Sequence, residues 1–353
     1  MKLIITNTIS ITVPAEKKVN NNPILRKEKT RQFYIIILLS IIITGTLIAF
    51  FLNNQAKVVT IGIAVWGDDD GYYRNVDSFK AGLETFGFIE DRNIKFIIKN
   101  AHTDNKVQRS IIQDFINNKV DLIYTITTPA TLIAQEMTSE IPIVFSIVTF
   151  PVQTGIIERI DNSGNNLVGT SNYVPISNQL DSVSNIVSLT KIGFVHRDGE
   201  PNSEIQFMEI KDYAVERGIE IIEIAPRDID EVEGAVLHVI DDVDMFYNAC
   251  DTLIQTGANK IVIRIASENK KPVVVCSEDD VAEGGLFGYV ANFKELGLQS
   301  GQQAALILQG IKPSSLVTEF QKNEYIIINL KTAKLLEIEI PEEILVIADE
   351  LIQ

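Results

Sequence analysis

The feature that most constrains the fold is a regular alternation of apolar, β-branched runs with helix-type stripes after residue 57. The first run, VVTIGIAV, covers Val58 to Val65 and has the composition of a strand buried on both faces. Apolar residues then recur at spacings of 3, 4 and 3, which places them on one helix face: Val76, Phe79, Leu83 and Phe86. This alternation predicts βαβ units and a parallel sheet.

The alternation runs through the chain twice. A first series extends to a strand at 167–173, and a second begins with a helix at 177–187 and a strand at 191–195. Two such series predict two parallel-sheet lobes, each covered by helices on both faces. Further helices are predicted at Val152–Ile160, at Thr252–Ser267 and from Pro341 to the end of the chain. In the second of these, a break at Gly257 is left open.

A second strong feature is the run Phe33–Leu52, which has no charged residue. At 1.5 Å per residue a helix of this length spans about 30 Å, the hydrocarbon thickness of a bilayer. Basic residues precede it at Arg26–Arg31, so the positive-inside rule places residues 1–32 in the cytoplasm, as a disordered tail, and residues 53–353 outside. We expect an uncleaved signal anchor. A cleaved signal peptide or a buried core helix is the alternative.

Charge and cysteine content exclude several classes of protein. Residues 1–32 carry a net +5 and the remainder carries −21, which together make up the formal −16. Such an acidic outer domain argues against nucleic-acid binding. Cys250 and Cys276 are too few for a disulfide scaffold and lack zinc-ligand spacing. Whether they pair is left open, and a free thiol at Cys250 is one of the two outcomes.

Small hydroxyl and amide residues follow several predicted strands. Ligands of open parallel sheets bind beyond the carboxyl ends of the strands, where helix N-termini offer free N–H groups. The first strand ends at Trp66, the only tryptophan, and a later one runs into Thr127-Thr128-Pro129. An ordinary helix cap is the alternative explanation for each hydroxyl.

The segment Thr127–Ile157, TTPATLIAQEMTSEIPIVFSIVTFPVQTGII, resembles a signature of the ABC transporter substrate-binding proteins that include tryptophan-binding members. The resemblance continues through NNLVGTSNYVP, GEPNS, SEDDVAEGGL and ELGLQSGQQAALILQG to residue 352. It implies the type I periplasmic-binding-protein fold: two α/β lobes joined by three crossover segments. We therefore expect lobe one at 57–173 plus 291–318, and lobe two at 174–290 plus 319–353.

The resemblance also implies ligand contacts at matching positions. Phe150 and Asn292 stand where the family usually has Asp, so the solute cannot be copied from a relative. The ligand-binding positions are Thr127, Thr128, Pro129, Val148, Thr149, Asn202, Ser203, Asp251, Tyr289 and Asn292.

These positions suit an amino-acid-like solute. Its carboxylate would lie at the helix N-termini near Thr127–Thr128 or Thr149, and Asp251 would take its ammonium group. Trp66 and Tyr289 would stack on an apolar or aromatic side chain. Helix capping by Asp251 and simple packing of Trp66 are the alternatives.

We expect a membrane-anchored, extracytoplasmic solute-binding component of an ABC importer that closes on its ligand by a hinge. The family implies a permease and its ATPase as partners. No catalytic constellation, metal site or cofactor motif is present in the sequence, and the histidines His102, His196 and His238 lack metal-ligand spacing. A sensing module without transport is the alternative, and an outer-face α/β enzyme is a weaker one.

Overall fold

The computed structural model describes residues 31, 33–35, 37–41, 43–44, 58–321 and 325–353, which fall in two compact units, Met1–Lys57 and Val58–Gln353. The described residues between 31 and 44 are helical. No helix within the described part of the chain is long and apolar enough to cross a membrane. Much of the predicted span Phe33–Leu52, and nearly all of the predicted tail, lies outside the described residues.

The second unit contains two sheets, and the first has the strand order β11-β5-β4-β3-β1-β2. All of its pairings are parallel, as expected for βαβ units. Its strands are β1 (Val59–Val65), β2 (Ile94–Asn100), β3 (Leu122–Ile126), β4 (Ile143–Ser146), β5 (Leu167–Ser171) and β11 (Glu319–Phe320).

The second sheet has the order β13-β12-β10-β9-β8-β6-β7. Its pairings are parallel except between β10 and β12, which run antiparallel. Its strands are β6 (Lys191–Val195), β7 (Glu220–Ile224), β8 (Met245–Asn248), β9 (Val273–Val275), β10 (Phe287–Val290), β12 (Tyr325–Asn329) and β13 (Glu350–Ile352).

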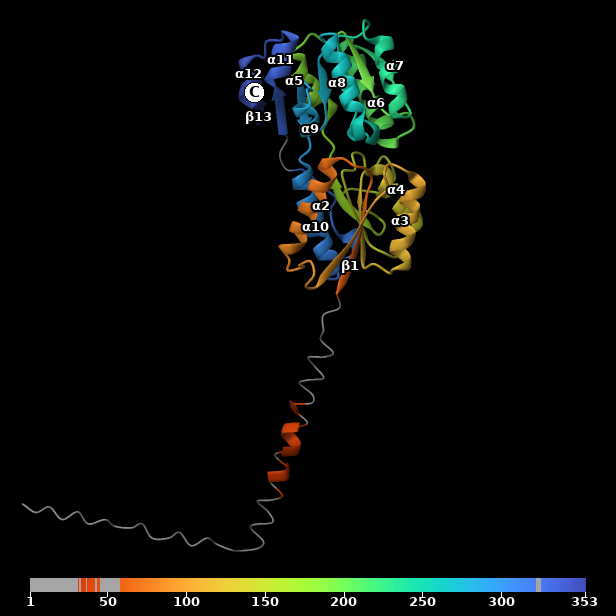
Figure 1. Cartoon of the computed structure of the whole chain (residues 1–353), viewed down its shortest axis with the longest axis vertical. Helices are drawn as coiled ribbons and strands as arrows, with labels where there is room; N and C mark the ends of the chain where they lie inside the picture. The colour runs from red at the N-terminus through yellow and green to blue at the C-terminus, as the bar shows by residue number, and fades with distance from the viewer. Residues whose placement is uncertain (1–30, 32, 36, 42, 45–57, 322–324) are drawn as a thin grey trace, which may run out of the picture. The chain divides into compact units, whose positions relative to one another are not determined.

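Helices cover both faces of the first sheet, as Figure 1 shows. On one side α2 packs against α10 at close range, because a Cβ at Gly301 would collide with the carbonyl oxygen of Phe79. On the other side α3 contacts α4. The bounds are α2 (Asp70–Glu84), α3 (Asn105–Asn117), α4 (Thr128–Met137) and α10 (Phe293–Leu308).

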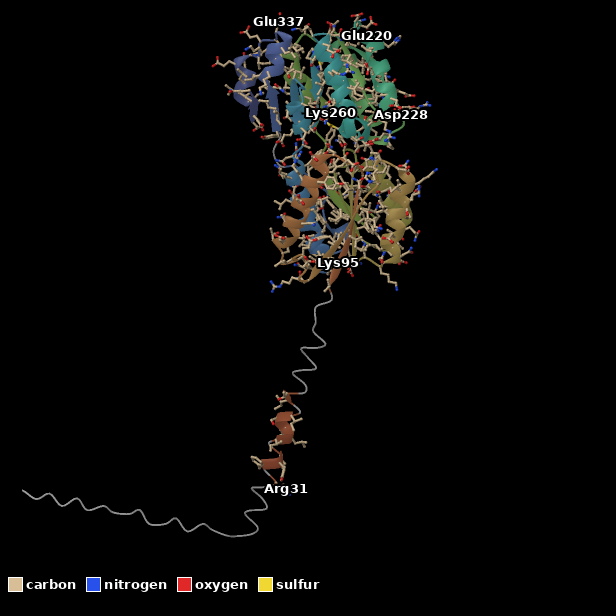
Figure 2. The ribbon with its side chains drawn as sticks, viewed as in Figure 1. Arg31, Lys95, Glu220, Asp228, Lys260 and Glu337 are labelled. Atoms are coloured by element: carbon tan, nitrogen blue, oxygen red, sulfur yellow. A yellow bond between two sulfur atoms is a disulfide. The ribbon has the colours of Figure 1, made fainter. Side chains whose placement is uncertain are left out.

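The second sheet separates two apolar clusters, one on each face. Around both sheets, charged side chains point outward (Figure 2), such as Lys95 of β2 and Glu220, Asp228 and Glu337 around the second sheet. The surrounding helices are α5 (Ile176–Ser184), α6 (Pro201–Arg217), α7 (Ile229–Val239), α8 (Asn259–Glu268), α9 (Glu278–Ala282), α11 (Leu330–Leu336) and α12 (Glu342–Ile347), with short helical segments η1 (Ile254–Ala258) and η2 (Pro313–Ser315).

The chain crosses between the sheets three times: after β5, after β10 and after β11. Two α/β bodies with parallel sheets are therefore present, as predicted. We keep the division into lobes as a proposal and move its last boundary past Phe320, because β11 pairs with β5. Lobe one below means residues 58–172 and 291–320, and lobe two means 173–290 and 325–353.

Two predicted helices differ from the structure, and a third is broken. Val152–Ile160 forms turns, with Gly155 at φ 77°, a backbone conformation that interrupts a helix. Thr252–Ser267 takes the broken form that the sequence left open, because Gly257, near the end of η1, has a non-helical φ of 142°. The helix after Pro341 ends at Ile347, and the edge strand β13 follows it.

Candidate functional site

Three neighbouring strands of the first sheet end at the same edge and supply the lobe-one side of the site. Trp66 directly follows β1, Thr127 follows β3, and Val148 and Thr149 follow β4 by two and three residues. Because β1, β3 and β4 are adjacent and parallel, their carboxyl ends bring these residues together. All four residues are buried.

Several of these side chains hold buried polar atoms without a partner. Among the described residues, Trp66 Nε1, Thr127 Oγ1 and Thr128 Oγ1 have no hydrogen-bond partner, and neither does Asn202 Oδ1 in lobe two. Trp66 is 1% exposed and Asn202 is 3% exposed, so water cannot easily satisfy these atoms. Orphaned buried polar atoms cost free energy, and a ligand that pairs with them would recover it.

The lobe-one edge also stores backbone strain. Thr127 has φ 82° and Ile147 has φ 55°, both in a region that β-branched residues rarely occupy. Thr127 is held there because its N–H donates to Ser146 O over 3.0 Å, and its carbonyl accepts from Thr131 Oγ1 over 2.7 Å. Such strain persists where the surroundings enforce it, and it is concentrated at functional sites.

Helix α4 begins at this edge with an open N-terminus. Its N-cap, Thr127, makes no side-chain capping bond, and Pro129 lies in the first turn. The first N–H groups of a helix lack intrahelical partners and carry a partial positive charge. This end of α4 therefore suits an anion such as a carboxylate.

The lobe-two side is built from two loops that bind each other. Asp251, after β8, accepts N–H groups from Arg197 over 2.7 Å and from Ile254 over 2.9 Å. Thr252 donates through its N–H and its Oγ1 to the two carboxylate oxygens of Glu200, over 3.0 and 2.5 Å. Asp251 thus makes the capping contacts that the sequence left as one alternative.

Both carboxyl groups in these loops are buried. Burial raises the pKa of Asp251, and nearby Glu200 raises it further. Burial also raises the pKa of Glu200, against the opposing effect of the hydrogen bonds from Thr252. Cationic groups entering here would favour the ionised carboxylates.

The remaining predicted positions are engaged locally. Ser203 Oγ donates to the carbonyls of Arg197 and Glu200, each over 3.1 Å. Asn292 caps α10 by accepting from Lys294 N and Glu295 N. The structure also places Thr149 Oγ1 against Asn172 Oδ1 at 3.1 Å, and buries Tyr289 on β10.

Cys250 and Cys276 form a disulfide with a Cα–Cα distance of 5.7 Å. The sequence left this pairing open, and the free-thiol outcome at Cys250 is wrong. Because β8 and β9 are neighbours in the sheet, the residues just beyond their ends are within bridging distance. No group of three or more potential metal-ligating side chains occurs among the described residues.

The two lobes touch through contacts that the sequence did not suggest. Tyr72 of α2 donates its hydroxyl to Gln255 Oε1 of η1 over 2.6 Å. Arg74 of α2 pairs with Asp279 of α9. These residues are far apart in the chain, and no local pattern marks them as partners.

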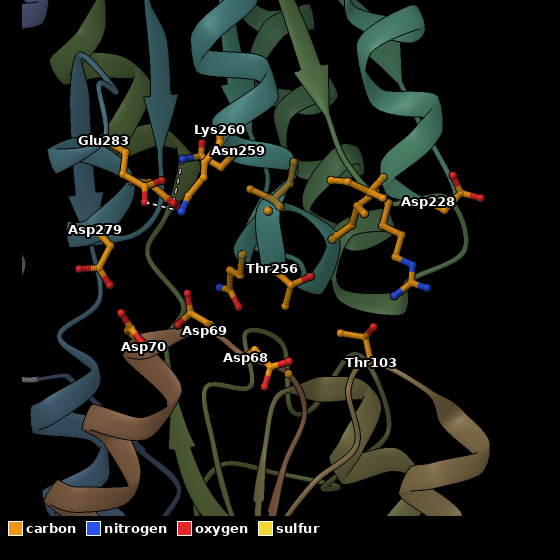
Figure 3. A pocket seen from close by; sticks show the side chains of 18 of the residues that line it. Asp68, Asp69, Asp70, Thr103, Asp228, Thr256, Asn259, Lys260, Asp279 and Glu283 are labelled. Carbon is orange, nitrogen blue, oxygen red and sulfur yellow. Dashed lines mark hydrogen bonds and ion pairs between the residues drawn. The ribbon is translucent and has the colours of Figure 1, made fainter.

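Two of the cavities among the described residues lie at the junction of the lobes and adjoin the candidate site. The first, about 520 Å³, lies between α4 and the loop before α6, and its lining includes Trp66, Pro129 and Glu200. The second, about 640 Å³, appears in Figure 3, with Asp68–Asp70 below and Lys260 and Glu283 above.

The second cavity is rich in carboxyl groups, of which Asp280 is buried. Burial raises the pKa of Asp69 to about 6 and that of Asp280 to about 8. Asp280 is 6% exposed, and its Oδ1 accepts a hydrogen bond from Asn259 Nδ2 over 2.8 Å. Lys260 compensates part of this charge by pairing with Glu283 at 2.9 Å.

Sequence reasoning did not assign Tyr72 or Glu200 to the site. Glu200 lies in the GEPNS segment, next to Asn202 and Ser203, so its position carried a signal. Tyr72 carried none, because its role depends on a partner 183 residues away.

Comparison with known proteins shows the family of the chain. A family model described as ABC transporter substrate binding protein matches residues 60–352. The chain is 32% identical over 289 residues to a tyrosine-binding protein of Clostridioides difficile, covering 81% of this chain and 83% of that protein.

Solved structures give the same result. An ABC domain from Streptococcus pneumonia in complex with L-Trp has a TM-score of 0.80 at 25% identity, covering 83% of this chain and 99% of that one. The ligand-free, open structure of a substrate binding protein from Clostridium difficile scores 0.66 at 29% identity, covering 84% and 99%. A conserved domain protein from Vibrio cholerae scores 0.81 at 25% identity, covering 84% and 100%.

Together with two α/β lobes and a buried polar cluster at their junction, these matches establish that the chain belongs to the ABC transporter substrate binding protein family.

Proposed function

We propose that this chain binds an aromatic L-amino acid, with tyrosine preferred, as the solute-binding component of an ABC importer. The observation that carries the proposal is the set of unpartnered buried polar atoms on Trp66, Thr127, Thr128 and Asn202. Similarity to a tyrosine-binding protein and to an L-Trp complex supports the ligand class.

The ligand carboxylate lies at the N-terminus of α4 in this proposal. It accepts hydrogen bonds from Thr127 Oγ1 and Thr128 Oγ1, which otherwise have no partner. Open N–H groups of the first helical turn add further donors. Val148 and Thr149, beyond the adjacent strand β4, form the neighbouring wall.

The ligand ammonium faces lobe two. Asn202 Oδ1 on α6 has no donor among the described residues. The carboxyl of Glu200 lies just before α6, and that of Asp251 lies in the loop after β8, which is hydrogen-bonded to the loop before α6. Each carboxylate oxygen can accept more than one hydrogen bond, so the capping contacts of Asp251 leave room for a cation. We retain Ser203, Tyr289 and Asn292 as proposed positions around this group.

Trp66 provides the discrimination between aromatic ligands. Its Nε1–H is a buried donor that finds no acceptor in the described part of the chain. A tyrosine phenol supplies an acceptor oxygen, whereas the indole N–H of tryptophan is only a donor and phenylalanine offers neither. The face of Trp66 remains available for stacking on the ligand ring.

Closure of the two lobes completes the mechanism. Ligand contacts from both lobes stabilise the closed arrangement, which the Tyr72–Gln255 and Arg74–Asp279 contacts also favour. The loaded protein then docks on a permease driven by its ATPase. We propose that the chain acts outside the cytoplasm, anchored by Phe33–Leu52.

Calorimetry on the full chain in mild detergent tests the ligand. L-tyrosine should bind most tightly, followed by L-tryptophan and L-phenylalanine, while L-alanine and ribose should give no heat of binding. A higher affinity for phenylalanine than for tyrosine would contradict the role of Trp66 Nε1. No binding of any aromatic amino acid would overturn the proposed ligand class.

A further inference from the structure

We propose that the Cys250–Cys276 disulfide positions the lobe-two half of the ligand site and thereby determines ligand affinity. The inference rests on the proposed function for its ligand, but its structural part can be tested without one. Cys250 lies two residues after β8 and Cys276 directly after β9. The bond therefore ties the loop after β8 to the end of the neighbouring strand.

The backbone of Cys250 holds two polar side chains of α6. Its N–H donates to Gln206 Oε1 over 2.9 Å, and its carbonyl accepts from Asn202 Nδ2 over 2.9 Å. The second bond orients the Asn202 amide so that its Oδ1 is the free acceptor assigned to the ligand. Movement of Cys250 would therefore displace that oxygen.

The residues after Cys250 extend this dependence. Asp251 and Thr252 bind the loop before α6 through Arg197 and Glu200. Three residues later, Gln255 accepts the hydroxyl of Tyr72 across the junction between the lobes. One short segment thus carries a ligand contact, the buried carboxyl network and an interlobe contact.

This segment has little regular structure to hold it. Residues 249–251 lie outside any helix or strand, and η1 ends with a break at Gly257. Irregular segments that make few backbone hydrogen bonds of regular secondary structure unfold locally at low free-energy cost. A covalent link at Cys250 restricts that opening, and the buried Cys276, which is 4% exposed, anchors it to the core.

Comparison of the oxidised and reduced full chain tests the proposal. Dithiothreitol splits the S–S bond into two thiols while its own thiols form a disulfide. Hydrogen exchange should then accelerate in peptides covering 196–206 and 249–257, while peptides of β1 in lobe one stay unchanged. The dissociation constant for L-tyrosine should rise at least fivefold.

The double variant Cys250→Ser/Cys276→Ser is the matched control. It should reproduce the reduced protein and show no further change with dithiothreitol. Unchanged exchange at 196–206 and 249–257 would overturn the proposal, as would faster exchange spread evenly over the second sheet, which describes a general stabiliser. Labelling of both cysteines by iodoacetamide without reduction would also overturn it. If the oxidised chain binds no aromatic amino acid, the proposed function fails, and the exchange data alone still decide the positioning role.

Discussion

The two halves of the candidate site are built in opposite ways. The lobe-one half presents unpartnered hydroxyl and indole groups on a strained backbone at Thr127 and beside it. The lobe-two half is nearly saturated with its own hydrogen bonds, between Glu200 and Thr252 and around Asp251, and a disulfide closes it. Among the described residues beside α6, its unpartnered atom is Asn202 Oδ1.

This difference indicates a division of labour between the lobes. A surface with unpaired polar atoms gains most from a ligand, because pairing removes a desolvation penalty already present. A saturated surface gains less, but its atoms are held in place before the ligand arrives, which lowers the entropy lost on binding. We therefore expect lobe one to supply most of the binding free energy and lobe two to act as a preorganised clamp.

Removing the unpartnered hydroxyls of lobe one tests most directly whether this lobe supplies most of the binding free energy. The variant Thr127→Val/Thr128→Val keeps the β-branched shape and should weaken L-tyrosine binding about 100-fold, because two ligand hydrogen bonds are lost. Calorimetry measures the change. Thr85→Val, at the far end of α2, is the control and should bind normally; equal affinities in all three proteins would refute the assignment.

Burial of the Asp280 carboxyl in lobe two has a cost that pH should reveal. The pKa of Asp280 is about 8 in the folded chain against 3.8 for the ordinary carboxyl, so the folded state binds more protons between these values. Stability should therefore fall as pH rises from 4 to 8. Asp280→Asn should lessen this loss by at least about 1.4 kcal/mol, the equivalent of one pKa unit.

Denaturant unfolding of both proteins at pH 5 and pH 8 measures this effect. The exposed Asp241→Asn serves as the control and should leave the pH dependence unchanged. The same slope in wild type and Asp280→Asn would show that this carboxyl is not held neutral by its surroundings.

The hydrogen bond between Tyr72 and Gln255 tests how much a contact between the two halves adds to ligand binding. Tyr72→Phe removes the hydroxyl that donates to Gln255, worth about 1 kcal/mol, and should weaken ligand binding about fivefold by disfavouring closure. Tyr213→Phe removes a hydroxyl bonded to Asp181 within lobe two and should bind normally. Small-angle scattering with saturating L-tyrosine should show the closed form in both variants, since the ligand still contacts both lobes.

The smallest expected effect concerns strain in lobe one. Thr127→Gly relieves the positive φ and should stabilise the ligand-free chain by about 1 kcal/mol or less, because glycine also loses more backbone entropy on folding. Its affinity for L-tyrosine should fall at the same time. Thermal unfolding should show the higher stability, and calorimetry on the same preparation should show the lower affinity. A destabilised variant would show that the backbone is not strained at Thr127.

Much of the lobe-one site could be predicted from the sequence. Thr127 and Thr128 stand directly after a buried apolar run and before Pro129, and the order of such runs predicts which loops share an edge. The same pattern predicted a helix at Val152–Ile160 that Gly155 interrupts, and it left the break at Gly257 open. The spacing of apolar residues indicates which face of an element is apolar, but it gives no information on the backbone dihedral angles of individual residues.

The amino-acid sequence was enough to predict the alternation of strands and helices, the two parallel sheets and the edge at which a ligand site would lie. Those properties follow from burial of apolar side chains with periods of 2 and 3.6, which is local information. Long-range contacts set the rest: backbone amides occupy Asp251, Tyr72 meets Gln255 and Cys250 pairs with Cys276. Each of these depends on where two distant segments meet, and hydrogen bonds and disulfides form only within a few ångströms of a partner.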